Sequence, residues 1–321
     1  MNKKNYLITG VAGFIGFNIA IGLLKKNNII YGVDNFEKYY SVKYKNFRLN
    51  KLKEFKNFKF KRIDIKDKTK LLNSFKNKKI DLIINCAAQA GVRYSFVNPK
   101  TYIGSNFFGF LNLIFLAKQN KIKKIIYSSS SSVYGDAKRL PVNERNELSK
   151  KNIYATTKKL NEDTAELYSK INDISFIGLR FFTIFGEWGR PDMLMFKMFK
   201  SQIEKKPIYI NNNGNHYRDF TYIGDVVKII NRLVNKKING HEIFNVSSNH
   251  PIKLLELVKN FNKKYPLTIK YAPLDKADVI NTHGDNYKIK KITNIKNFSN
   301  FYEKLFKTFL WYKKNKINKI T

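Results

Sequence analysis

The sequence is poor in cysteine and in acidic residues, and it lacks any long apolar segment. Cys86 is the single cysteine, so no disulfide can form within the chain and a cysteine-based zinc site is not expected. No apolar run approaches the length of a membrane span, and no apolar segment with a cleavage site comes before the first predicted strand. We therefore predict a cytoplasmic protein that carries no metal and has no membrane partner.

Acidic residues are outnumbered by basic ones. The chain has 24 Asp and Glu against 61 Lys and Arg, which gives a net charge of +37. Such an excess would suit a polyanionic partner, either nucleic acid or an anionic membrane. However, the basic residues form no single arm or stripe, and Lys-Lys pairs recur along the whole chain. We interpret the lysines as scattered solvated positions and expect no nucleic-acid partner, although the charge would still attract an anionic ligand.

Strand and helix patterns alternate from the start of the chain. Apolar runs predict strands at 6–8, 29–33, 58–60, 82–84, 125–127, 175–180 and 243–245, with a further strand near Phe220. Helical periodicity predicts helices at 14–26, 42–55, 68–75, 99–119, 154–169, 193–203, 225–234, 252–264 and 301–312. This alternation favours an α/β fold, a doubly wound parallel sheet of the Rossmann type with a smaller C-terminal lobe. The predicted division assigns residues 1–179 and 221–246 to the main domain, and residues 180–220 and 247–321 to a substrate-binding lobe.

A glycine-rich segment joins the first predicted strand to the first predicted helix. Its Gly-x-x-Gly-x-x-Gly spacing lets the backbone turn tightly and approach a pyrophosphate at a helix N-terminus. Asp34 ends the second strand, where a carboxylate would bind the adenosine ribose and repel a 2′-phosphate, which favours NAD over NADP. The predicted cofactor contacts here are Gly10, Gly13, Phe14, Ile15, Gly16, Asp34, Asn35, Asp64, Ile65, Ala87 and Ala88.

Tyr154 and Lys158 are one helical turn apart, so both can face the same cleft. The pKa of a free tyrosine is about 10, which is too high for an efficient base at neutral pH. A nearby ammonium and an oxidised nicotinamide both favour the phenolate, and Lys158 can also hold the nicotinamide ribose. The alternative is that Tyr154 and Lys158 occur together by chance on an exposed helix. The glycine loop upstream argues against this alternative. The pair therefore indicates reversible alcohol oxidation.

The serine run 128–132 contains no carboxylate. An enzyme that eliminates water from a sugar needs a general acid for the leaving hydroxyl, and serine is a poor one. The run therefore disfavours dehydration.

Three motifs resemble the extended short-chain dehydrogenase/reductase superfamily. They are Thr-Gly-Val-Ala-Gly-Phe-Ile-Gly at 9–16, Ser-Ser-Ser-Ser-Val-Tyr-Gly at 129–135 and Tyr-Ala-Thr-Thr-Lys-Lys at 154–159. Four further segments, at 34–42, 87–95, 179–193 and 218–223, resemble UDP-glucuronate 4-epimerases in particular. The likeness is dense to about Val246 and thin beyond it.

The resemblance implies a role for each matched position. Tyr154 would be the base, Lys158 its partner and cofactor contact, and Ser130 the serine that binds the reacting hydroxyl. The implied substrate contacts are Arg93, Ser131, Ser132, Thr183, Arg190 and Arg218. Arg218 would grip the UDP diphosphate, for which a guanidinium fork is suited, whereas Arg93 is equally well read as a surface arginine.

The implied reaction interconverts UDP-glucuronate and UDP-galacturonate through a 4-keto sugar, with NAD as cofactor. The same analogy implies a homodimer formed by helices 99–119 and 154–169. It also implies a product that is used for a surface polysaccharide. The alternatives are 4-epimerisation of another UDP-hexose or UDP-N-acetylhexosamine, decarboxylation, and a weakly active NAD-binding homologue that works as a basic scaffold.

Two segments depart from the family pattern. The family has a Gln-Pro-Gly-Asp-Val-Pro-like turn near the nucleotide, and this chain has Asp275-Lys276-Ala277-Asp278-Val279-Ile280 in its place. In the second segment, Glu187 replaces a proline. The first departure bears on UDP affinity and substrate choice, and neither touches Ser130, Tyr154 or Lys158.

Overall fold

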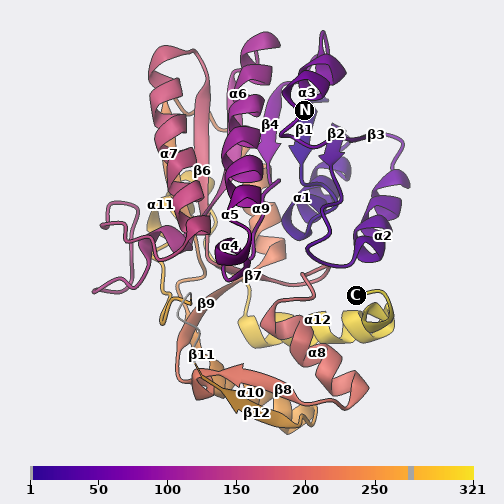
Figure 1. Cartoon of the computed structure of the whole chain (residues 1–321), viewed down its shortest axis with the longest axis vertical. Coiled ribbons are helices and arrows are strands. Elements are labelled where there is room, and N and C mark those ends of the chain that lie inside the picture. Colours follow the sequence, from indigo (N-terminus) through magenta and orange to yellow (C-terminus); the bar gives the residue numbers. More distant parts are fainter. Residues whose placement is uncertain (1–2, 274–277) are drawn as a thin grey trace.

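The structure, a computed structural model, describes residues 3–273 and 278–321. Within these residues, seven parallel strands form one twisted sheet in the order β10-β6-β5-β4-β1-β2-β3 (Figure 1). The strands are β1 (Asn5–Thr9), β2 (Ile29–Asp34), β3 (Phe58–Arg62), β4 (Leu82–Asn85), β5 (Lys124–Ser130), β6 (Ser175–Phe181) and β10 (His241–Val246). The strand order reverses next to β1, as it does in a doubly wound sheet. The predicted fold class is confirmed.

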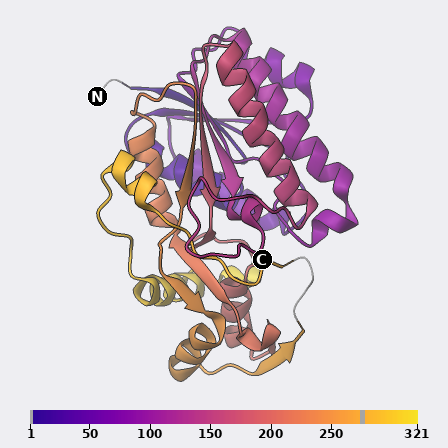
Figure 2. The same ribbon diagram turned by 90° about the vertical axis from the view of Figure 1, so that its left-hand side faces the viewer.

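Helices cover both faces of this sheet (Figure 2). One face carries α1 (Phe14–Leu24), α2 (Val42–Lys53) and α9 (Ile223–Leu233), and the other carries α3 (Lys68–Phe75), α6 (Gly109–Gln119) and α7 (Ile153–Ile171). Successive residues of a strand point to opposite faces, so Ile8 packs with Phe17 of α1 while Leu7 packs with Phe110 of α6. Burial on both faces explains why the strands are almost continuously apolar.

The single helix predicted at 99–119 contains a π-helical turn. It is built from α5 (Pro99–Tyr102), the π-helix η1 (Ile103–Phe108) and α6. Asn106 of η1 is buried, and its amide nitrogen donates to the carbonyl of Gln89 (3.1 Å) and to the hydroxyl of Thr157 (3.0 Å). Its amide oxygen accepts from the backbone N–H of Gln89 (2.7 Å). The π-turn therefore ties the loop after β4 to the N-terminal part of α7.

Of the short strands in the smaller lobe, the sequence pattern predicted only the one near Phe220, which is β9 (Tyr217–Tyr222). A three-stranded sheet has the order β11 (Pro251–Lys253), β9, β7 (Thr183–Phe185), and β8 (Ile208–Asn211) pairs with β12 (Ile269–Ala272). Helices α8 (Leu194–Glu204), α10 (Leu254–Lys264) and α12 (Phe301–Lys314) pack here. Phe199, Phe261 and Phe309 form the centre of the core, which Tyr44 of α2 also joins. The lobe is thus packed against the main domain.

The boundaries of the two domains stay a prediction. Helix α11 (Tyr287–Thr293) falls in the range assigned to the lobe, yet Ile289 is buried in the core of the main sheet together with α9. Separately, none of the helices in the described part of the chain has the length and apolarity needed to cross a membrane.

Candidate active site

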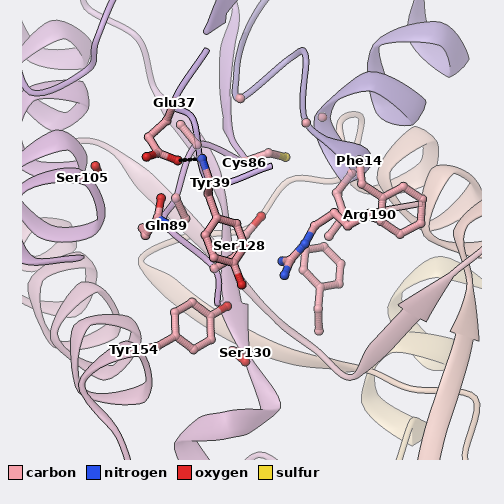
Figure 3. Close-up of a pocket in the computed structure, with 18 of the residues that line it drawn as sticks. Phe14, Glu37, Tyr39, Cys86, Gln89, Ser105, Ser128, Ser130, Tyr154 and Arg190 are labelled. Carbon is pink, nitrogen blue, oxygen red and sulfur yellow. Dashed lines mark hydrogen bonds between the residues drawn. The ribbon is translucent and has the colours of Figure 1, made fainter. Parts of the chain in front are cut away.

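A cavity of about 380 Å³ lies at the carboxyl ends of the parallel strands, where α/β proteins bind ligands (Figure 3). All but two of the predicted site residues line it. They are Gly10, Gly13, Phe14, Ile15, Gly16, Asp34, Asn35, Asp64, Ile65, Ala87, Ala88, Ser130, Ser131, Ser132, Tyr154, Lys158, Thr183 and Arg190. Residues from both halves of the sheet and from the lobe therefore meet in one place.

The glycine loop leaves room for a dinucleotide in a way that larger residues would not. A Cβ at Gly16 would lie 2.3 Å from the carbonyl oxygen of Gly10, and a Cβ at Gly10 would lie 2.7 Å from the backbone nitrogen of Ala87. Helix α1 begins at Phe14, and Gly13 at its N-cap offers no side-chain cap. The first backbone N–H groups of α1 are thus available to a phosphate, and the residues present fit NAD.

Asp34 sits at the end of β2 with its carboxylate in the cavity wall. Its two oxygens accept hydrogen bonds from the backbone N–H groups of Ala12 (3.0 Å) and Phe36 (2.9 Å). Burial raises the pKa of Asp34, and these two hydrogen bonds together with Lys45 oppose that rise. Because a carboxylate has about four acceptor positions, Asp34 can still accept hydrogen bonds from ribose hydroxyls.

Tyr154 and Lys158 project from the first turns of α7, whose N-terminus is capped by the Asn152 side chain. The Tyr154 hydroxyl points toward Ser130 in the cavity (Figure 3). Burial raises the pKa of Tyr154, while its hydrogen bond with Ser130 and the charge of Arg190 lower it. The Lys158 side chain is buried, and burial lowers its pKa to about 8. Both groups are therefore placed for proton transfer.

The serine run ends β5 and continues into a short 3₁₀ turn, Ser131–Tyr134. The Ser130 hydroxyl accepts from the backbone N–H of Ser132 and donates to the Ser132 hydroxyl, both at 3.1 Å. Thr183 at the start of β7 lines the same cavity. The site thus presents several hydroxyls next to Tyr154, and the serine run brings no carboxylate to it.

Arg190 extends into the cavity from the loop after β7 (Figure 3). Its Nε and Nη2 donate to the two oxygens of Asp192 at 3.0 and 2.5 Å, and Tyr39 donates to the same carboxylate at 3.3 Å. Within the part of the chain that the structure describes, Nη1 of Arg190 has no acceptor. The guanidinium is thus held by one edge and can offer the other to a ligand.

Arg93 and Arg218 do not line this cavity, in contrast to the other predicted substrate contacts. Arg218 donates to the backbone carbonyls of Val279 (2.6 Å) and Ile280 (2.7 Å), and Arg93 pairs with Asp278 at 2.6 Å. Both arginines therefore bind the segment 278–280. Asp275 and Lys276 belong to the segment that departs from the family pattern and bears on UDP affinity, and both lie outside the described residues.

Several residues that line the cavity were not among the predicted contacts. They include Glu37, Tyr39, Lys45, Gln89 and Ser105. Gln89 is buried, and its amide nitrogen has no hydrogen-bond partner among the residues that the structure describes. Tyr39 belongs to a segment that carried the family resemblance, which was the available signal. Ser105 reaches the cavity from the π-turn, for which no local signal exists.

Comparisons with known proteins agree with this geometry. The model of the NAD dependent epimerase/dehydratase family matches residues 6–247. A UDP-glucuronate 4-epimerase of Thermodesulfobacterium geofontis is 38% identical over 97% of this chain and 96% of its own, and protein CapI of Staphylococcus aureus is 38% identical over 87% and 89%. The crystal structure of UDP-glucuronic acid 4-epimerase from Bacillus cereus, in complex with UDP-glucuronic acid and NAD, matches with a TM-score of 0.89 and 28% identity, covering 97% of this chain and 99% of that chain. The chain therefore belongs to the NAD dependent epimerase/dehydratase family.

Proposed function

We propose that this protein is an NAD-dependent UDP-glucuronate 4-epimerase, which interconverts UDP-glucuronate and UDP-galacturonate. The observation that carries the proposal is the meeting of Ser130, Tyr154 and Lys158 in the cavity that the glycine loop also lines. The relatives named UDP-glucuronate 4-epimerase support the same substrate class. Gly10, Gly13 and Gly16 would hold the pyrophosphate of NAD, and Asp34 its adenosine ribose.

Proton transfer at C4 of the sugar is the task of this chain's own residues. Tyr154 accepts the proton of the C4 hydroxyl, and Ser130 orients that hydroxyl by a hydrogen bond. Lys158 supplies the positive charge that favours the Tyr154 phenolate. NAD, when bound, supplies a hydride acceptor and donor for C4, so the reaction has no net redox change. After the 4-keto sugar has turned in the pocket, Tyr154 returns the proton to the C4 oxygen.

The 4-keto form of a hexuronate is a β-keto acid, which loses carbon dioxide readily. An epimerase must therefore hold the carboxylate so that the breaking bond does not align with the ketone. The hydroxyls of Ser131, Ser132 and Thr183 line the cavity together with Arg190. We propose that this group holds the carboxylate while the sugar turns.

The test is a product assay. Purified protein is incubated with UDP-glucuronate and no added NADH, and the sugars are identified by NMR. We expect UDP-galacturonate. Formation of UDP-pentose alone would establish a decarboxylase, and absence of turnover in protein that contains NAD would remove the proposal. UDP-glucose and UDP-N-acetylglucosamine in parallel reactions test the other epimerase specificities, and salt-dependent binding to mixed nucleic acid tests the scaffold alternative.

A homodimer is proposed on the basis of an exposed apolar face. Helix α7 packs against η1, and the two elements expose Ile103 (44%), Phe108 (54%), Leu167 (63%) and Ile171 (74%) to solvent. Large apolar side chains exposed on neighbouring helices are typical of association sites. Light scattering after size-exclusion chromatography should give twice the chain mass, and a Leu167→Glu and Ile171→Glu double variant should give the monomer. We further propose that the enzyme acts in the cytoplasm and supplies galacturonate for a surface polysaccharide.

A further inference from the structure

A buried ion pair lies beneath the serine run. Arg180 of β6 donates through Nε and Nη2 to the two carboxylate oxygens of Glu162 on α7, at 2.9 and 2.7 Å. Each side chain is only 5% exposed. Neither residue lines the cavity, so the pair does not meet the substrate or the cofactor there.

The pair binds both ends of the segment that carries Ser130. The Ser129 hydroxyl donates to Glu162 at 2.6 Å, and Nη1 of Arg180 donates to the Tyr134 hydroxyl at 2.8 Å. Ser129 precedes Ser130 in the chain, and Tyr134 ends the 3₁₀ turn that follows it. Two directed hydrogen bonds thus connect α7 and β6 to the two flanks of the serine segment, and two more join Arg180 to Glu162.

Helix α7 is also the element that carries the proton-transfer residues. Glu162 follows Lys158 by four residues and Tyr154 by eight, so all three lie along one side of the helix. A bond from Glu162 to Ser129 therefore fixes where Ser130 stands relative to Tyr154. A shift of the strand along the helix would have to break the bonds of this pair first.

Stability alone does not account for such a pair. Apolar residues of similar volume often hold two elements together equally well or better, because two buried charges lose their hydration. Apolar side chains, however, make no directed bonds to Ser129 and Tyr134. We propose that Glu162 and Arg180 are positioning residues that set the distance between Ser130 and Tyr154. This inference rests on the proposed roles of Ser130, Tyr154 and Lys158.

The experiment compares the wild type with a Glu162→Met and Arg180→Met double variant, which removes both charges together. We expect a folded protein whose thermal midpoint is unchanged or higher, with unchanged NAD content and a KM for UDP-glucuronate within about twofold. Since misplacement by about 1 Å can cost about 100-fold in rate, we expect kcat per NAD-loaded site to fall by roughly 10- to 100-fold. Deuterium at C4 of the substrate should then slow kcat more than in the wild type, because the chemical step has become limiting.

A milder variant keeps the inference testable if the double variant does not fold. Ser129→Ala removes one hydroxyl and leaves the ion pair intact, and Ser201→Ala is the matched control, a buried serine of α8 that donates to the carbonyl of Lys206. We expect kcat to fall in Ser129→Ala and to stay unchanged in Ser201→Ala. Wild-type kcat in a folded double variant, or equal kcat in the two serine variants, would overturn the inference. Activity in Tyr154→Phe would instead overturn the proposed function, so the two failures can be told apart.

Discussion

Lys158 donates a hydrogen bond of 2.7 Å from its ammonium to the backbone carbonyl of Ser128. This bond crosses from the helix that carries Tyr154 to the strand that carries Ser130. The ammonium lies 5.7 Å from the centre of the Tyr154 ring, and in the proposed mechanism it acts on the phenol through its charge. Burial lowers the pKa of Lys158 to about 8, while Cys86 and Glu162 oppose that shift.

The charge of Lys158 should therefore limit activity at alkaline pH. Below a pH of about 8 the ammonium keeps its proton and favours the Tyr154 phenolate, and above it the amine is neutral. We expect kcat/KM to fall as the pH rises through this value. In Lys158→Arg the decline should move to higher pH, because a guanidinium does not lose its proton in this range. Lys159→Arg, next to it on α7, is the control, and an identical profile in Lys158→Arg would contradict the assignment.

Tyr154→Phe should abolish most turnover and leave the cofactor in place. A positioned acid or base contributes about 10²- to 10⁴-fold to a rate, and we expect kcat to fall by that amount. NAD content, measured after denaturation of the purified protein, should not change. Tyr94→Phe, at the start of the short helix α4 (Tyr94–Val97), is a matched control. The Tyr94 hydroxyl accepts only a 3.5 Å bond from Asn98 within the described residues. Near-normal activity of Tyr154→Phe would exclude it as the base.

Arg190→Met should weaken binding of sugars that carry a carboxylate. A hydrogen bond to a charged group contributes about 1.5–3 kcal/mol, so we expect KM for UDP-glucuronate to rise roughly 10- to 100-fold. The affinity for UDP, measured by calorimetry, should change little because UDP has no such carboxylate. Equal losses for UDP and UDP-glucuronate would show that Arg190 binds the nucleotide part of the substrate instead.

Arg218→Gln should give the opposite pattern. Burial lowers the pKa of Arg218 to about 10, and Asp278 and Asp136 oppose that shift, so the guanidinium keeps its charge at neutral pH. If Arg218 binds the diphosphate, the variant should lose affinity for UDP and for every UDP-sugar by a similar factor. Arg232→Gln, on the last turn of α9, serves as the control. Unchanged UDP affinity in Arg218→Gln would leave it with the sole task of holding Val279 and Ile280.

Elements specified by local patterns were predicted well from the sequence. Helix α3 occupies the predicted residues, because Asp67 caps its first turn and Leu71 and Phe75 form its buried side. Apart from the strand near Phe220, which is β9, the strands of the lobe were missed because they are short and pair over long distances. Strand β7, for example, has three residues and pairs with β9, more than thirty positions later.

In the candidate site, too, the contiguous motifs were predicted from the sequence and the long-range contacts were not. The glycine loop, the serine run and the Tyr154–Lys158 pair are each contiguous in sequence, and the structure brings them together as the motifs predict. Tyr39 and Asp192 are 153 positions apart, so the hydrogen bond between them has no local signal. The position of Arg218 depends on the path of residues 278–280, which only the folded chain determines.

Because of the π-turn at Ile103–Phe108, the contacts made by this helix depend on its exact number of residues. A π-turn holds one residue more than an α-turn. Removing one residue there would restore a regular α-helix and take away the widened turn in which Asn106 lies. Asn106 could then no longer face both Gln89 and Thr157. A relative with such a deletion would retain the catalytic side chains and still lose the hydrogen bonds by which Asn106 joins the loop after β4 to α7. A one-residue gap at this helix is therefore as informative about function as a substitution in the site.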